Sequence, residues 1–163
     1  MAKYHFIIIG SGWRALYYVP VAKALPEIFC IDAMYCRTQE KADKMAEEFS
    51  IHTTTSIEEC VGYKPDFAVV AVNKTSICDV SIEWMDREIT VLSETPAALD
   101  MDSLKKLYRY HMSDDKTDKK QVVAEQYREY PYNKARINLV NSGVLGDISC
   151  LNISIAHEYH GFS

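Results

Sequence analysis

The chain has 163 residues, of which 48% are hydrophobic and 25% charged, and its formal net charge is -5 at pH 7. This ordinary globular composition excludes a disordered, collagen-like or coiled-coil protein. A net negative chain lacks the surplus of Lys and Arg that binding to phosphate backbones needs, so nucleic acid is not an expected partner. No apolar stretch is long enough for a transmembrane helix, so we expect no membrane partner.

Two further features bear on the cellular compartment. The N-terminal segment MAKYHFIIIGSG lacks the length and the cleavage site of a signal peptide and is typical of a first strand. The five cysteines are odd in number, widely spaced and form no C-x-x-C pair, which indicates neither a disulfide framework nor a zinc site. Reduced thiols in a cytoplasmic protein are the simplest interpretation. We expect Cys78 and Cys150 to be small core residues, because no neighbouring base marks them as nucleophiles.

The first elements form a strand–helix–strand sequence. Tyr4–Ile9 is a short apolar run that predicts a buried strand, closed by Gly10-Ser11-Gly12. Trp13–Leu25 predicts a helix that is disturbed near Pro20, which cannot donate a backbone hydrogen bond. Ile28–Tyr35 predicts the second strand.

The same alternation continues along the chain. Further strands are predicted at His52–Thr54, Asp66–Val72, Ile89–Ser93 and Gln121–Glu125. Helices or helical turns are predicted at Thr38–Phe49, Ser56–Val61, Ser76–Arg87 and Met101–His111. Thr38 stands in the N-cap position, and the near-continuous apolar run of Asp66–Val72 is typical of a strand covered on both faces. Strands that alternate with helices predict an α/β fold with a Rossmann-like, doubly wound parallel sheet.

A different pattern follows the charged segment Ser113–Lys120. Tyr132–Ser142 predicts a helix that stops at Gly143, and Ile148–Ala156 predicts a further strand. This strand has no later partner in the sequence, and an unpaired apolar edge is an aggregation hazard. We therefore expect a fragment of a longer protein, with a natural remnant as the alternative, in which residues 125–163 are the incomplete start of a second domain.

The strongest functional motif is GSGWRA, between the first strand and the first helix. Gly10 permits the tight turn, Gly12 lets the backbone approach a pyrophosphate, and Ala15 provides the small residue for helix–strand packing. The start of the helix offers N–H groups and a positive dipole end to phosphate oxygens. The motif predicts a dinucleotide site formed by Gly10, Ser11, Gly12, Trp13 and Arg14, and a purely structural turn is the alternative.

The residues after the second strand bear on the choice of cofactor. Ribose recognition uses an acid about 20 residues after the glycine motif, at a strand tip. Asp32 has this spacing but falls within the predicted strand, and the tip carries Cys36, Arg37 and Thr38. An Arg suits a 2′-phosphate, which favours NADP over NAD. The alternative is that Arg37 is a solvated surface residue.

A third group of candidates follows the fourth strand. Val72, Asn73 and Lys74 lie where ligands bind in open α/β sheets, at the carboxyl ends of the strands. Lys74 is either a charged loop residue or a source of positive charge at the site.

The order of several segments is similar to that of a known family. GSGWRA is followed by CRTQEKADKMAEEF, DFAVVAVNKTS, VLSETPAAL and EQYREYPYNKARINLVNSGVLGDI. The chain resembles the Gfo/Idh/MocA oxidoreductases, which pair an N-terminal Rossmann domain with a C-terminal α/β domain. The resemblance implies that residues 1–124 are the dinucleotide-binding domain. It also implies that residues 125–163 begin a domain for substrate binding and oligomerisation.

The resemblance also implies roles for single residues. The family has a Glu-Lys-Pro motif whose lysine lies near the nicotinamide and the substrate, and here the motif is Glu94-Thr95-Pro96. By resemblance, Asn73, Glu94 and Gln126 contact the cofactor, and Glu94, Thr95 and Tyr127 are the candidate catalytic residues. Tyr127 is alternatively an interdomain packing residue. The family often has a His where this chain has Cys78, and Lys74 can replace the charge missing at Thr95.

His157, Glu158 and His160 are the only other cluster of ligand-type residues that the pattern singles out. Two His three positions apart on a strand point to opposite faces, and no further ligand is evident, so we expect a substrate-contacting or merely exposed pair there and no metal site.

Two functions of different classes fit these patterns. The first is an NAD(P)-dependent oxidoreductase that passes hydride between the nicotinamide and a sugar-like, polyol or carbonyl substrate, as a homo-oligomer when the protein is full length. The second is a non-catalytic dinucleotide-binding sensor or regulator of the same fold, which the substitution at Thr95 favours.

Overall fold

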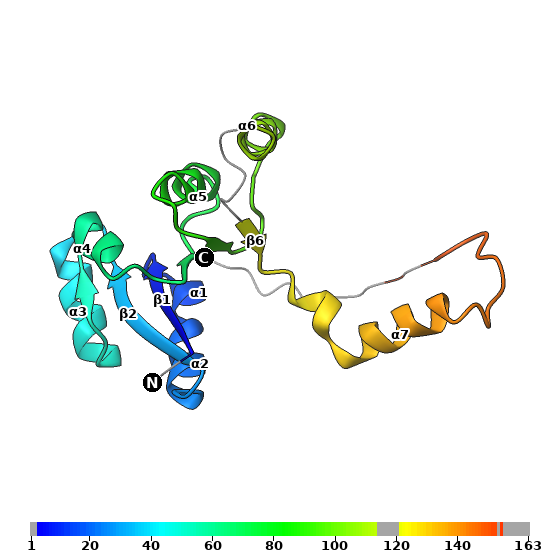
Figure 1. Cartoon of the computed structure of the whole chain (residues 1–163), viewed down its shortest axis with the longest axis horizontal. Coiled ribbons are helices and arrows are strands. Elements are labelled where there is room, and N and C mark those ends of the chain that lie inside the picture. The colour runs from blue at the N-terminus through cyan, green and yellow to red at the C-terminus, as the bar shows by residue number, and fades with distance from the viewer. Residues whose placement is uncertain (1–2, 114–120, 153, 155–163) are drawn as a thin grey trace. The chain divides into compact units, whose positions relative to one another are not determined.

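The computed structural model describes residues 3–113, 121–152 and 154. The chain divides into two compact units, Met1–Ala124 and Glu125–Ser163 (Figure 1). The first unit holds the sheet and its flanking helices, and the second holds a short helical segment. Among the described residues, no helix is long and apolar enough to cross a membrane.

The first unit is built on a single parallel sheet of six strands in the order β3-β2-β1-β4-β5-β6. The strands are β1 (Tyr4–Ile9), β2 (Phe29–Tyr35), β3 (Thr53–Thr54), β4 (Phe67–Val70), β5 (Val91–Ser93) and β6 (Gln121–Val123). From β1 the chain first builds outward through β2 and β3, and then returns to the other side of β1 to add β4, β5 and β6. The order reverses between β1 and β4, which is the switch point where ligands bind in such sheets. The predicted Rossmann-like fold is confirmed.

Helices cover both faces of this sheet. They are α1 (Trp13–Leu16), α2 (Tyr18–Ala24), α3 (Gln39–Phe49), α4 (Ile57–Gly62), α5 (Ile77–Met85) and α6 (Met101–His111). Helices α1 to α3 bury Ala15, Val19 and Met45 against Phe6 and Ile8 on one face. Helices α4 to α6 bury their apolar residues on the other face, where the core includes Ile7, Ile9, Cys60, Trp84, Met85 and Leu107. The central strands are therefore apolar on both sides, as the run of β4 predicts.

Three helices begin with a side-chain cap. The side-chain oxygens of Thr38, Ser56 and Asp100 accept hydrogen bonds from backbone N–H groups in the first turns of α3, α4 and α6. These caps satisfy donors that have no partner inside the helix. Helices α1, α2, α5 and α7 have no side-chain cap, and the residue before α1 is Gly12, which has no side chain to serve as one.

The predicted helix Trp13–Leu25 is in fact two helices divided at Tyr17, so the disturbance expected near Pro20 lies three residues before the proline. Pro20 has no N–H to donate to the carbonyl of Leu16, and its ring crowds that carbonyl. The break therefore appears in the turn before the proline, where Tyr17 N–H donates to the Arg14 carbonyl over 3.2 Å.

The predicted strand Gln121–Glu125 is shorter than expected, because pairing with β5 ends at Val123. The chain then enters a 3-10 helix, η2 (Gln126–Glu129), and α7 (Pro131–Asn141). Gly143 follows α7 with φ of 73°, a left-handed conformation that suits glycine at a helix end.

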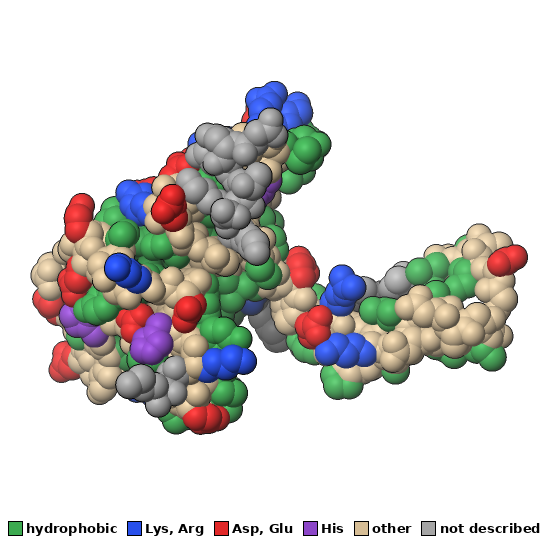
Figure 2. All heavy atoms as spheres, in the orientation of Figure 1, with side chains coloured by type: hydrophobic (Ala, Val, Ile, Leu, Met, Phe, Trp, Pro, Cys, Tyr) green, Lys and Arg blue, Asp and Glu red, His purple; other side chains and the backbone are tan. Residues whose placement is uncertain are grey.

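The predicted strand Ile148–Ala156 is wrong for its described residues, none of which belongs to a strand. A strand needs a partner for its backbone hydrogen bonds, and no described segment pairs with these residues. None of the described residues of the second unit is buried, and Figure 2 shows hydrophobic side chains on its surface. These include Tyr132, Leu139, Val144 and Leu151.

Candidate functional site at the carboxyl edge of the sheet

Four strand ends are aligned at the switch point by backbone hydrogen bonds. Gly10 N–H donates to the Tyr35 carbonyl over 3.2 Å, which joins the ends of β1 and β2. Ala71 N–H donates to the Ile9 carbonyl over 3.0 Å, and Glu94 N–H to the Val70 carbonyl over 3.0 Å. Residues just after β1, β2, β4 and β5 therefore share one edge. This edge brings together most of the cofactor residues predicted from the first unit.

Gly10 makes the close approach between the ends of β1 and β4 possible. Its φ is 112°, which L side chains rarely adopt. A Cβ atom at this position would lie 2.5 Å from the carbonyl oxygen of Ala71 and 3.1 Å from its carbonyl carbon. Both the backbone conformation and the space thus require glycine at this turn.

Gly12 has the opposite surroundings. A Cβ atom built on it would meet none of the described residues within 4 Å, and its φ of -81° is open to any residue. The packing of the chain itself therefore does not require glycine here. A ligand that approaches the backbone closely needs open space of this kind.

The start of α1 lies directly after this open position. Leu16 N–H donates to the Gly12 carbonyl over 3.2 Å, which closes the first turn. Thr38, Ser56 and Asp100 place a side-chain oxygen at the first turns of α3, α4 and α6, whereas Gly12 brings no such acceptor to α1, and α2, α5 and α7 also lack a side-chain cap. The positive end of a helix without a capping side chain favours an anion.

Glu94 connects the end of β5 to the first two helices. The Tyr18 hydroxyl donates to Glu94 Oε1 over 2.8 Å, and Arg14 Nη1 lies 3.6 Å from Glu94 Oε2. The Glu94 side chain is buried, and the bonds to Tyr18 and Arg14 hold its carboxylate in place. Burial, together with the hydrogen bond to Glu94 and its negative charge, raises the pKa of Tyr18, although the charge of Arg14 opposes the shift. Tyr18 therefore remains a hydrogen-bond donor at physiological pH.

Tyr18 is a residue of this candidate site that the sequence motifs do not identify. Its only signal is its spacing of four residues from Arg14, which would place both on one side of the single helix predicted at Trp13–Leu25. The partner, Glu94, is distant in sequence, and only the sheet brings it near.

Thr95 and Pro96 follow Glu94 and are half-buried, and the peptide bond between them is cis. Thr95 offers a hydroxyl group at this edge but no positive charge. After the end of the neighbouring strand β4, Val72 is half-buried, while Asn73 and Lys74 are exposed. Asn73 Oδ1 accepts hydrogen bonds from Thr75 N–H and from the Thr75 hydroxyl, both over 3.1 Å, so it shapes the loop after β4.

The tip of β2 presents the residues expected to bind the ribose end. Cys36 is buried, and its N–H donates to the Thr54 carbonyl over 2.9 Å. Burial raises the pKa of the Cys36 thiol, although a hydrogen bond with Ser11 and the charge of Lys41 act the other way. Arg37 is exposed and has no hydrogen bond or ion pair within the described part of the chain.

Thr38 is exposed beside Arg37 and caps α3, with its hydroxyl oxygen accepting the N–H of Lys41 over 3.4 Å. Asp32, by contrast, lies inside β2 and is bonded to His5 near the opposite end of the strands. Its position agrees with the expectation that Asp32 is not at the strand tip.

The remaining candidates lie elsewhere. Gln126 and Tyr127 belong to η2 in the second unit and are exposed, and their predicted roles near the cofactor stay predictions. His157, Glu158 and His160 lie outside the described residues. Cys78 is buried in α5 as expected, and its thiol donates to the Ser103 carbonyl over 3.3 Å. Cys150 is exposed, which corrects the expectation of a core residue, because the described residues of its own segment are exposed as well and form no core around it.

The geometry of this edge agrees with the comparisons to known proteins. Residues 4–119 match the oxidoreductase family GFO_IDH_MocA, described by its NAD-binding Rossmann fold. The chain belongs to this family. Residues 4–119 are therefore an NAD(P)-binding Rossmann domain, and the resemblance expected from the sequence is confirmed. No curated protein shows significant similarity to the chain.

Solved structures support the assignment to the Gfo/Idh/MocA family at the level of the fold. Scyllo-inositol dehydrogenase from Lactobacillus casei has a TM-score of 0.75 and 15% identity over 91% of this chain and 45% of its own. The WlbA dehydrogenase from Chromobacterium violaceum, solved with NADH and UDP-GlcNAcA, has a TM-score of 0.76 and 15% identity over 90% and 42%. An oxidoreductase from Thermotoga maritima has a TM-score of 0.73 and 25% identity over 89% and 45%. The chain spans less than half the length of these structures.

Replacement of Tyr18 by Phe tests the connection between α2 and β5. The variant removes the donor to a buried carboxylate oxygen, and we expect the free energy of unfolding to fall by about 1–3 kcal/mol. The measurement is urea unfolding followed by circular dichroism. Tyr17→Phe is the matched control, because Tyr17 is the exposed neighbour, and its effect should stay within about 0.5 kcal/mol. Equal effects of the two substitutions would contradict a specific role for the Tyr18 hydroxyl.

Proposed function

We propose that the diphosphate of the NAD(P) cofactor binds beside Gly12, against the first turn of α1. The observation that carries this proposal is the contrast between the two glycines of the turn. Gly10 has no space for a Cβ atom because the backbone of Ala71 fills it, whereas the space at Gly12 is open among the described residues. Gly62, at the end of α4, has the same open space, so what favours a ligand at Gly12 is this space together with its position after β1, at the switch point of the sheet.

The substitution Gly12→Ala tests this proposal. Because the added methyl group meets no described residue, we expect the melting temperature to change by less than about 2 °C. The same methyl group enters the space assigned to the diphosphate, so the affinity for NADH and NADPH should fall on the order of tenfold or more. Fluorescence titration of the reduced cofactors measures the affinity.

Gly10→Ala is the matched control, since it adds the same methyl group to the same turn. We expect this variant to be destabilised, because its Cβ atom would overlap the Ala71 carbonyl. A Gly12→Ala variant that keeps full cofactor affinity would contradict the proposed position of the diphosphate.

The preference for NADP over NAD is a finer proposal that rests on Arg37. Arg37 is exposed at the tip of β2, and its guanidinium is not engaged by any described residue. A planar guanidinium binds phosphate oxygens through paired, charge-assisted hydrogen bonds. It is therefore suited to the 2′-phosphate that distinguishes NADP.

Replacement of Arg37 by Gln is expected to weaken NADPH binding about tenfold, since the loss of hydrogen bonds to a charged group costs about 1.5–3 kcal/mol. The affinity for NADH should change by less than about threefold. Dissociation constants for both cofactors test this, with Arg109→Gln on the exposed surface of α6 as the control. An equal loss for NADH and NADPH would instead assign Arg37 a general electrostatic role.

For the whole protein we propose hydride transfer to or from a sugar-like or polyol substrate. The dehydrogenases with the same fold include one named for scyllo-inositol and one solved with NADH and UDP-GlcNAcA. The nicotinamide, when bound, supplies the hydride donor or acceptor. In this chain, Glu94 keeps the end of β5 against α1 and α2 through Tyr18 and Arg14. The Thr95 hydroxyl can hydrogen-bond a ligand at the same edge, and Lys74 supplies a positive charge from the next loop.

Thr95 favours a second candidate function, a dinucleotide-binding sensor or regulator without turnover. By resemblance, the family has a lysine where this chain has Thr95, and a threonine hydroxyl is a poor proton donor near neutral pH. The Glu94 carboxylate is bonded to Tyr18 and Arg14, and it is negatively charged, so it does not supply the positive charge of the missing lysine.

Thr95→Lys in the complete protein, assayed with a panel of polyols and sugar derivatives, separates the two functions. If the regulator proposal holds, the parent shows no turnover and the variant gains it, because the lysine restores the missing charge. Turnover by the parent protein would reject the regulator and support the oxidoreductase. As a control, the NADH affinity of both proteins is measured, and we expect it to be retained, which shows that both bind the cofactor.

We also propose that residues 125–163 begin a second domain that binds substrate and forms oligomers. The second unit exposes apolar side chains, and the related structures are more than twice as long as the part matched here. We place the protein in the cytoplasm, because all five cysteines are unpaired thiols in the structure.

A further inference from the structure

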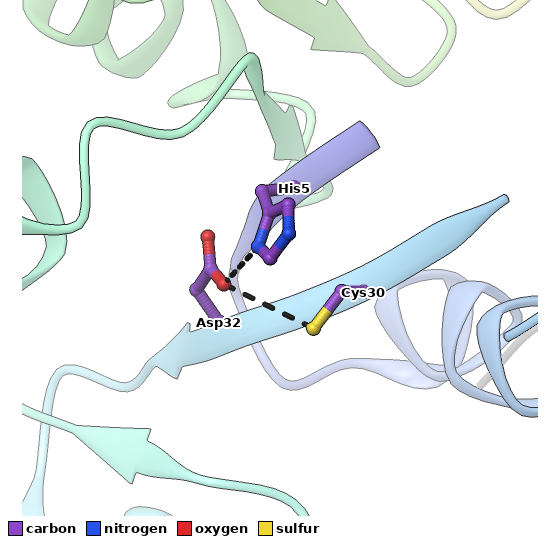
Figure 3. Close-up of side chains that lie close together, drawn as sticks. All are labelled: His5, Cys30 and Asp32. Atoms are coloured by element: carbon purple, nitrogen blue, oxygen red, sulfur yellow. Dashed lines mark hydrogen bonds and ion pairs between the residues drawn. The ribbon is translucent and has the colours of Figure 1, made fainter. Parts of the chain in front are cut away.

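Three side chains with metal-binding groups meet near the amino ends of β1 and β2 (Figure 3). His5 Nδ1 lies 2.8 Å from Asp32 Oδ1, and Cys30 Sγ lies 4.0 Å from the same oxygen. One ligand atom from each of the three residues lies within 4.8 Å of the others. The group thus places a nitrogen, a sulfur and an oxygen donor around one small volume.

The fold builds this cluster through the pairing of the two strands. His5 and Cys30 are direct neighbours across β1 and β2, so their side chains share one face. The register then shifts, because Phe6 pairs with Ile31 and Ile7 pairs with Ala33, which leaves Asp32 as the extra residue of a β-bulge. A bulge redirects a side chain, and here it turns Asp32 toward His5.

Asp32 is incompletely satisfied in this arrangement. Its side chain is only 12% exposed, and its Oδ2 atom is buried without a hydrogen-bond partner within the described residues. Buried carboxylate oxygens are normally paired, so the described residues leave part of the acceptor capacity of Asp32 unused, while its Oδ1 atom faces His5 and Cys30. His5 is 47% exposed, which leaves the cluster open to solvent on that side.

We propose that His5, Cys30 and Asp32 bind a divalent cation of the zinc class, with water at the fourth position. Zinc takes nitrogen, thiolate sulfur and carboxylate oxygen ligands in a tetrahedral arrangement. Ligand distances of about 2.0–2.3 Å separate the ligand atoms by roughly 3.3–3.7 Å, a spacing that lies inside the range found in this cluster.

The charge of the site also fits a divalent cation. The thiol loses its proton to solvent on binding, as coordination requires, and the neutral imidazole binds through the Nδ1 lone pair. Thiolate and carboxylate together then carry two negative charges, which balance the cation. Asp66, which accepts the His5 backbone N–H over 2.7 Å, adds a further carboxylate at this end of the strands.

The site is independent of the proposed cofactor site. His5 lies near the start of β1 and Gly10 follows its end, so at about 3.3 Å per residue the two are on the order of 15 Å apart. The cation would join β1 to β2 at the amino edge and touch neither Gly12 nor Glu94. The three residues do not have the sequence spacing of a known metal motif. The sequence therefore does not reveal the site, because only the pairing of β1 with β2 brings His5 next to Cys30.

Titration of the reduced, metal-free chain with Co²⁺ tests the proposal. We expect one equivalent to bind, with a thiolate-to-cobalt charge-transfer band that Zn²⁺ removes by competition. Cys30→Ser should abolish the band, since no thiolate remains in the cluster. His5→Gln and Asp32→Asn should each weaken binding on the order of tenfold or more.

Cys150→Ser is the matched control, because Cys150 is an exposed thiol outside the cluster, and this variant should keep both the band and the affinity. His5→Gln changes an exposed side chain and should keep the fold, as circular dichroism without metal checks. NADH affinity should be unchanged in all of these variants, which separates a failure here from a failure of the proposed cofactor site. The absence of a charge-transfer band, its survival in Cys30→Ser, or its loss in Cys150→Ser would each overturn the proposal.

Discussion

The close contact between Gly10 and the carbonyl of Ala71 is the constraint on which the cofactor edge depends. It lets the chain leave β1 directly beside the end of β4, at the point where the strand order reverses. With Gly10 fixed in this way, Gly12 stands at the start of α1 with open space beside its backbone. In this turn, the packing of the protein requires a glycine at position 10, and the ligand that we assign to the site requires one at position 12.

The other side of the edge is fixed by a charged and buried side chain. Glu94 holds the end of β5 to α1 and α2 through Arg14 and Tyr18, so the loop that carries Thr95 is tied to the helices that follow the glycine turn. This connection makes Glu94 a positioning residue in our account. The chemistry at the edge then depends on what Thr95 and Lys74 can supply, which is why the regulator remains the competing proposal.

Much of the first unit could be predicted because its signals are local. Alternating strands and helices indicate the parallel sheet, and Thr38 caps α3 as its position predicts. The failures involve partners distant in sequence. The hydrogen bond from Tyr18 to Glu94 and the bulge at Asp32 depend on how the sheet assembles, and the predicted strand Ile148–Ala156 has no described segment to pair with. The break at Tyr17 is an exception, since Pro20 predicts a disturbance but not the turn in which it falls.

A crystal structure of the chain with NADPH would test the central claim most directly. We predict that the diphosphate oxygens lie within about 2.7–3.2 Å of backbone N–H groups at the turn that contains Gly12. A diphosphate bound away from this turn, or a turn whose N–H groups are capped by side chains of the protein itself, would contradict the account.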